Sequence, residues 1–171
     1  TVDGNYFRGY YYPKARAGRI VEYLSQDRKW SLEDMKQINL DVVSNSTPEV
    51  AKEMASVLTS ANKPEFAPLI SLLQKWNGDH KSTDTAPSVY YNMLSQVYYS
   101  SMKDELGADA LNSILATSTP KNSVNSFIKN ESSPWWDDIN TKQLKETRAM
   151  IFEKAALRTL ALLKETCGQN P

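Results

Sequence analysis

The chain carries few residues of the types that do covalent chemistry. Cys167 is its one cysteine and His80 its one histidine. A cysteine nucleophile needs a basic partner such as histidine, and these two residues lie in different segments. We therefore expect Cys167 to be a bystander thiol near the end of the last helix, and an internal disulfide is excluded.

His80 and the acidic residues could in principle hold a metal or share a proton. His80 lies in a polar stretch with scattered aspartates, whereas zinc sites usually combine three or four closely spaced ligands. That stretch is expected to be a surface loop, and neither a metal nor a cofactor is predicted. Asp137 and Asp138 are adjacent, so on a helix they point in different directions and are expected to form an acidic first turn.

Thr1 could act as a nucleophile, because an N-terminal hydroxyl can use its own amine as base. Such a residue normally begins a β-strand in a layered α/β domain, with oxyanion donors from other strands. The sequence shows no such layers, so we expect Thr1 to mark a cleavage boundary. Trp135 and Trp136 are expected to anchor the last helix by packing, although aromatic surfaces also suit peptide ligands.

The overall composition is typical of one globular domain. The chain has 171 residues, of which 40% are hydrophobic, and 20 basic residues balance 20 acidic ones. A net charge of zero provides no long-range attraction to nucleic acid or anionic membranes. No apolar run approaches the roughly 18–20 residues of a membrane span. The start of the chain lacks the pattern of a signal peptide, which leaves export open because a mature chain would look the same.

Hydrophobic periodicity predicts a mainly α fold. Residues 1–13 are rich in tyrosine and are expected to be extended, and helices are expected from 15 to 168. Cap signals place helix starts at Ser31, at Thr47 before Pro48, and at Thr141. The prediction is a single helical domain over residues 1–171, an irregular bundle of about six or seven helices.

Several motifs occur in the order found in one enzyme family. They are Gly9-Tyr10-Tyr11-Tyr12-Pro13-Lys14-Ala15-Arg16-Ala17-Gly18-Arg19-Ile20, Ser31-Leu32-Glu33-Asp34-Met35, Asp41-Val42-Val43-Ser44, Leu73-Gln74-Lys75-Trp76-Asn77-Gly78, Ala86-Pro87-Ser88-Val89-Tyr90, Lys103-Asp104-Glu105-Leu106 and Ser133-Pro134-Trp135-Trp136-Asp137-Asp138. Together they resemble part of the β chain of the penicillin amidase family, the N-terminal nucleophile hydrolases that include penicillin acylases and acyl-homoserine-lactone acylases.

The resemblance implies a mechanism of which this chain holds only a part. In the family, the N-terminal serine of the β chain attacks an amide carbonyl and uses its own amine as base. That serine lies upstream of the matched region, and by spacing the oxyanion asparagine falls just before Thr1, with Asn5 as a poorly matching substitute. Arg19 corresponds to the family's arginine near the active site, which helps position that asparagine and the substrate. The family's calcium ligands have no good match.

Two functions stay open at this point. In the first, the chain is the helical part of a larger α/β amidase and is inactive alone. Its partners are then the α chain and the rest of the β chain, its substrate is a small N-acyl compound, and its location is periplasmic or secreted, as is frequent in the family. In the second, it is a stand-alone helical interaction module with an aromatic-lined groove, and Arg19 merely pairs with Glu22 on a helix surface. The full open reading frame separates the two.

Overall fold

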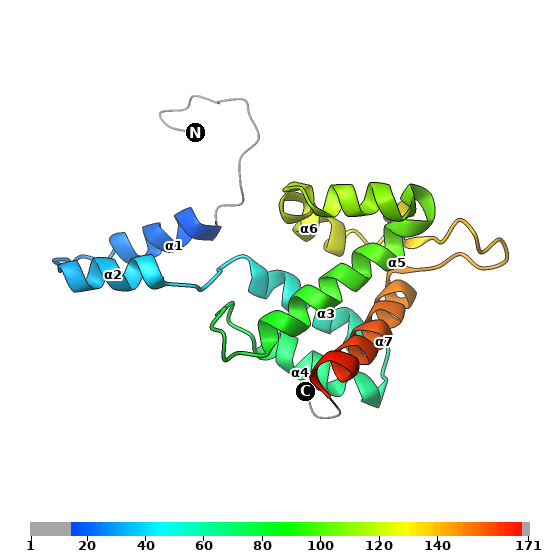
Figure 1. Ribbon diagram of the computed structural model, residues 1–171, viewed down its shortest axis with the longest axis horizontal. Coiled ribbons are helices and arrows are strands. Elements are labelled where there is room, and N and C mark those ends of the chain that lie inside the picture. The colour runs from blue at the N-terminus through cyan, green and yellow to red at the C-terminus, as the bar shows by residue number, and fades with distance from the viewer. Residues whose placement is uncertain (1–14, 169–171) are drawn as a thin grey trace, which may run out of the picture.

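The computed structural model describes residues 15–168, which form seven α-helices and two short 3₁₀ helices (Figure 1). The helices are α1 (Ala15–Leu24), α2 (Leu32–Leu40), α3 (Thr47–Ser60), α4 (Ala67–Lys75), α5 (Ala86–Leu115), α6 (Thr119–Lys129) and α7 (Arg148–Cys167), with η1 (Pro64–Phe66) and η2 (Pro134–Trp136). The predicted mainly α bundle is confirmed. Residues 1–13, for which an extended segment was predicted, lie outside the described residues together with Thr1 and Asn5.

Helices α3–α7 form the bundle and bury the hydrophobic core. Helix α3 packs on α4, α6 and α7, and α5 packs on α4, α6 and α7 (Figure 1). Ala51 and Ala55 of α3 and Ala155 and Ala156 of α7 have no exposed surface. Small side chains at these contacts let the helix backbones approach one another closely.

A row of packed aromatic rings links α5, α6, η2 and α7. Trp136 stacks on Phe127 with ring centroids 4.4 Å apart, and Phe127 stacks on Tyr98 at 5.4 Å. Trp136 also meets Phe152 of α7 edge-on at 6.0 Å, and its indole N–H donates to the Asn130 carbonyl at 2.7 Å. The buried indole ring thus packs against other aromatic rings, and its N–H group has a hydrogen-bond acceptor. This confirms Trp136 as a packing anchor for the last helix.

Three helix starts differ from the prediction. Helix α7 begins at Arg148, and its cap is Thr147, whose hydroxyl accepts from the Met150 amide. Thr141 is instead a loop residue whose hydroxyl contacts the Glu146 carboxylate at 2.8 Å. Thr47 already belongs to α3 and caps nothing with its side chain. Helix α6 begins at Thr119, a start for which no cap signal was predicted, and Pro120 lies in its first turn, where proline is tolerated.

Helices α1 and α2 form an arm beside the bundle (Figure 1). The Ser31 hydroxyl accepts from the Asp34 amide, and the Asp34 carboxylate accepts from the Ser31 amide, so the predicted cap is a complete capping box. No residue of α2 is buried, and Leu32 and Leu40 are 76% and 70% exposed. The described part of the chain therefore does not cover the apolar side chains of the arm.

Gly78 joins the arm to the bundle. The Ser44 amide donates to the Gly78 carbonyl at 2.8 Å, next to an isolated antiparallel bridge between Val43 and Asp79. Gly78 has φ +87°, and a Cβ there would lie 1.9 Å from the Ser44 carbonyl oxygen. Only glycine accepts both the positive φ and this close approach. Gly78 therefore acts as a contact point between two segments.

Candidate active site

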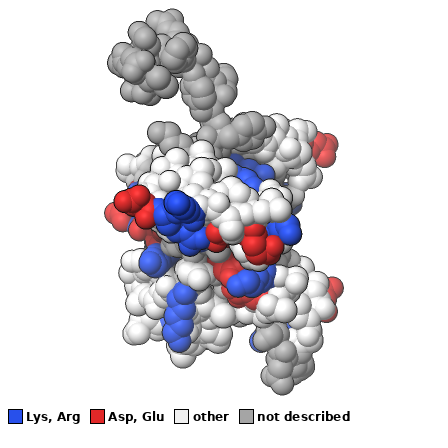
Figure 2. All heavy atoms as spheres, turned by 90° about the vertical axis from the view of Figure 1, so that its left-hand side faces the viewer, with Lys and Arg blue, Asp and Glu red and all other residues white. Residues whose placement is uncertain are grey.

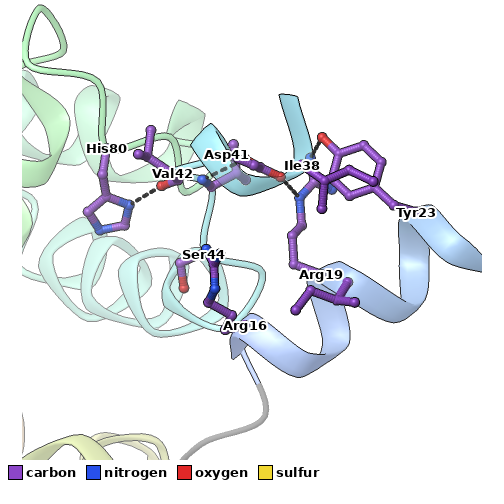
Figure 3. A pocket seen from close by; sticks show the side chains of 10 residues that line it. Arg16, Arg19, Tyr23, Ile38, Asp41, Val42, Ser44 and His80 are labelled. Atoms are coloured by element: carbon purple, nitrogen blue, oxygen red, sulfur yellow. Dashed lines mark hydrogen bonds and ion pairs between the residues drawn. The ribbon is translucent and has the colours of Figure 1, made fainter. Parts of the chain in front are cut away.

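A hollow of about 260 Å³ lies where the arm meets the bundle (Figure 3). Helix α1, the end of α2, the segment that follows it and the loop after α4 all contribute to its wall. Its lining residues are Arg16, Arg19, Ile20, Tyr23, Ile38, Asp41, Val42, Val43, Ser44 and His80. The hollow thus brings Arg19, the predicted site residue, together with side chains from distant parts of the sequence.

Arg19 is held by three side chains. Its Nε donates to the Asp41 carboxylate at 2.7 Å, Nη1 to Glu22 at 2.7 Å and Nη2 to the Tyr23 hydroxyl at 3.1 Å. The guanidinium carbon also lies 4.8 Å from the centre of the Tyr23 ring. A guanidinium has five N–H groups, so its bonds to the described residues leave one N–H on each Nη atom. These two donors can bind an oxygen atom of a ligand.

The carboxylates around Arg19 keep it positively charged. The hydrogen bonds to Glu22 and then to Asp41 raise the pKa of Arg19 above its ordinary value. Burial acts to raise the pKa of Asp41, but hydrogen bonds from the Val43 amide and from Arg19 outweigh it, and the pKa lies below its usual range. Asp41 therefore stays ionised near neutral pH, and the ion pair between Arg19 and Asp41 persists at that pH.

His80 lines the same hollow, although the sequence placed it in a separate surface loop. Its Nδ1 lies 2.7 Å from the Gly78 carbonyl and 3.1 Å from the Val42 carbonyl, so Nδ1 must carry the proton. Its Nε2 meets the Tyr91 hydroxyl at 3.1 Å, and the ring packs edge-on against Trp76 at 5.0 Å. His80 thus helps to fasten the arm to the bundle. Between residues 15 and 168, no cluster of three or more metal-binding side chains occurs.

The other sequence candidates lie elsewhere. Asp137 accepts from the Glu146 amide at 3.0 Å, and Asp138 accepts from the Asn140 amide at 3.1 Å. They organise the loop before α7, so the predicted acidic first turn is wrong. Cys167 is an exposed free thiol at the end of α7, as expected. Asp41, the main partner of Arg19, had no signal in the sequence beyond its motif, because 22 residues separate the two.

Comparison with models of protein families gives a match over the whole chain. The family model described as Penicillin amidase matches residues 1–171. The chain belongs to the penicillin amidase family. No curated protein matches it.

Membership in the penicillin amidase family supports an amidase-type hydrolase. The predicted resemblance is confirmed over its full extent. Within the described residues, no helix combines the length and apolar character needed to cross a membrane. Within residues 15–168, the hollow around Arg19 combines a charged side chain with N–H donors that the described residues leave free.

Proposed function

We propose that the chain is the helical part of a penicillin amidase-type hydrolase that cleaves the linear amide bond of N-acyl compounds, such as penicillins or acyl-homoserine lactones. Arg19 lies at the edge of the active site and donates to the substrate or to the group that holds the oxyanion. The observation that carries this proposal is a permanently charged guanidinium, 28% exposed, that lines a hollow and keeps two N–H groups free of the described residues.

The chemistry that Arg19 assists is acyl transfer. A nucleophile adds to the amide carbon, negative charge develops on the carbonyl oxygen, and the C–N bond then breaks to release the amine. Water hydrolyses the acyl-enzyme and releases the acid. Fixed N–H donors directed at the developing charge stabilise this transition state, and a guanidinium supplies them in a planar array.

The nucleophile comes from another part of the amidase. Ser44 is the serine that lines the hollow, but its Oγ contacts the Ser46 hydroxyl at 3.2 Å and accepts from the Thr47 amide at 3.4 Å. His80 makes no hydrogen bond to a serine, threonine or cysteine side chain within residues 15–168. The resemblance supports an N-terminal serine with its own amine as base.

The exposed apolar side chains of the arm support association with the rest of the amidase. Leu32, Leu40 and Val21, which lie on the two helices of the arm, are each more than 60% exposed, and exposed apolar side chains are available for contact with another protein segment. On the side of the molecule where the arm lies, basic and acidic side chains are mixed together (Figure 2). Such a surface suits docking on protein rather than on nucleic acid. By family resemblance, the compartment proposed is periplasmic or secreted.

The first experiment replaces Arg19 by glutamine in the complete gene product. Release of acid from a penicillin and from an acyl-homoserine lactone is measured by kcat/KM. Removing a donor to a developing oxyanion should lower kcat/KM by about 10²–10³-fold. Arg28→Gln is the matched control, because Arg28 lies on the arm and pairs with Asp34, outside the hollow.

The same assay tests the division of roles. Residues 1–171 alone should release no acid, since the nucleophile is proposed to lie elsewhere. Turnover by residues 1–171 alone, or an Arg19→Gln variant as active as wild type, would contradict the proposal. Absence of amide hydrolysis by the complete gene product would also contradict it.

A second function, binding of a peptide or aromatic ligand, is favoured by one observation. A hollow of about 410 Å³ at the other end of the bundle is lined by the half-buried side chains of Met102, Phe127 and Trp135 together with three serines. Aromatic and methionine side chains suit apolar ligands. The full open reading frame discriminates, because an upstream serine at a maturation site favours the amidase and a short self-contained frame favours the binding module.

A further inference from the structure

The two carboxylates that hold Arg19 differ in their surroundings. The Asp41 side chain is 7% exposed, whereas the Glu22 side chain is 56% exposed. Glu22 lies one helical turn from Arg19 and can swing into solvent, so its ion pair is readily exchanged. Asp41 has no such freedom, because it ends α2 and is surrounded by protein.

Asp41 is itself fixed by the backbone. Its Oδ1 accepts from the Val43 amide at 2.9 Å, and its own amide donates to the Ile38 carbonyl at 3.4 Å. Its Oδ2 is thereby aimed at the Nε of Arg19, 2.7 Å away. The two oxygens of this carboxylate therefore have different donors: one accepts from the backbone and the other accepts from the guanidinium (Figure 3).

Contact at Nε sets the direction of the whole guanidinium plane. The plane is rigid, so fixing Nε with Asp41 and supporting one Nη with the Tyr23 hydroxyl determines where the remaining N–H groups point. Without a partner at Nε, the long side chain would sample several rotamers. Misplacement of a positioning group by about 1 Å can lower a rate by about 10²-fold.

We infer that Asp41 is a positioning residue of the amidase, which orients Arg19 through Nε while the exposed Glu22 leaves when substrate binds. This inference rests on the proposed function. It assigns Asp41 no contact with the substrate and no proton transfer. Its effect on catalysis passes through Arg19 alone.

The test uses Asp41→Asn in the complete gene product. The asparagine Oδ1 can still accept from the Val43 amide, so the end of α2 is preserved, but Nδ2 is a donor and cannot accept from Nε. We expect kcat/KM to fall about 10- to 100-fold for amide substrates. Asp41→Ser, which also keeps an acceptor for the Val43 amide, should show the same loss and serves as the second variant.

A double-mutant cycle separates positioning from a general structural effect. If Asp41 acts through Arg19, then Asp41→Asn should cause no further loss in an Arg19→Ala background. Added guanidinium ion at millimolar concentration should partly restore the activity of Arg19→Ala, because Asp41 can bind the free ion. It should restore nothing in the Arg19→Ala/Asp41→Asn double variant.

The outcomes distinguish this inference from the proposed function. Arg19 variants with full activity would overturn both. If Arg19 variants have low activity but Asp41→Asn is fully active, only the positioning role is overturned. Equal rescue of Arg19→Ala and of Arg19→Ala/Asp41→Asn by guanidinium would likewise overturn only the positioning role. Asp34→Asn is the control, since Asp34 lies on α2 and pairs with Arg28; its kcat/KM should match wild type.

Discussion

Glu105 is a carboxyl group whose surroundings favour its protonated form. Partial burial, followed by the hydrogen bond and the negative charge of Asp104, raises the pKa of Glu105 from its ordinary 4.5 to about 7. Asp138 adds further negative charge, while its own carboxylate lies 3.6 Å from Lys154. A raised carboxyl pKa means that the folded state binds a proton that the unfolded state has released.

The folded protein should therefore lose stability as the pH rises from about 4.5 through about 7 because of Glu105. Glu105→Gln removes the group that titrates. The free energy of unfolding of this variant, relative to that of wild type, should therefore be higher at pH ~8 than at pH ~5. Urea unfolding at both pH values measures this difference. Glu33→Gln, an exposed substitution on α2, is the control and should show no such pH dependence; an equal difference in both variants would contradict the assignment.

At the scale of the element, the start of α7 depends on one side chain. Helix α7 could have begun after either of two threonines, Thr141 or Thr147, and the structure selects Thr147. The reason lies in the loop that precedes the helix: the Glu146 amide and carboxylate are engaged by Asp137, Asp138 and Thr141, so residues 137–146 close into a loop. Local cap preferences could not distinguish the two positions.

Thr147→Ala should lower the free energy of unfolding by about 1 kcal/mol, because the Met150 amide loses its cap acceptor. Chemical denaturation measures the change. Thr166→Ala is the matched control: its hydroxyl bonds to the Leu162 carbonyl within the same helix and caps no amide, so its effect should be smaller. A larger loss at Thr166 than at Thr147 would show that the cap is wrongly placed.

At the scale of the molecule, the arm and the bundle meet at few contacts. The Ser44–Gly78 hydrogen bond, the Val43–Asp79 bridge and His80 on the Val42 carbonyl join them. These contacts also form one wall of the hollow around Arg19. The position of Arg19 relative to the bundle therefore depends on a small junction rather than on a broad core.

Gly78→Ala should disrupt this junction, since its Cβ would clash with the Ser44 carbonyl. Gly107→Ala is the control: Gly107 has φ +72°, but a Cβ there meets nothing within 4 Å, so only backbone strain of about 1–3 kcal/mol is expected. Hydrogen exchange at the Ser44 amide should accelerate in Gly78→Ala and remain unchanged in Gly107→Ala. Equal exchange rates in the two variants would contradict the role of the junction.

Local signals in the sequence predicted the helices and the family. Ser31 begins a helix as expected, and apolar periodicity predicted a mainly α fold, because caps and helical faces depend on residues within one or two turns. The ordered motifs predicted the penicillin amidase family along the whole chain. Arg19 could be named as a site residue because it lies within one of those motifs.

The tertiary structure decided which side chains surround that arginine. Asp41 and His80 reach the hollow from 22 and 61 positions along the chain, and nothing in helical periodicity relates them to Arg19. The approach of His80 depends on the close contact between Gly78 and Ser44, which no local pattern in the sequence indicates. Helix formation is local and therefore readable from neighbouring residues, whereas a site built between segments is set by long-range packing that no short pattern encodes.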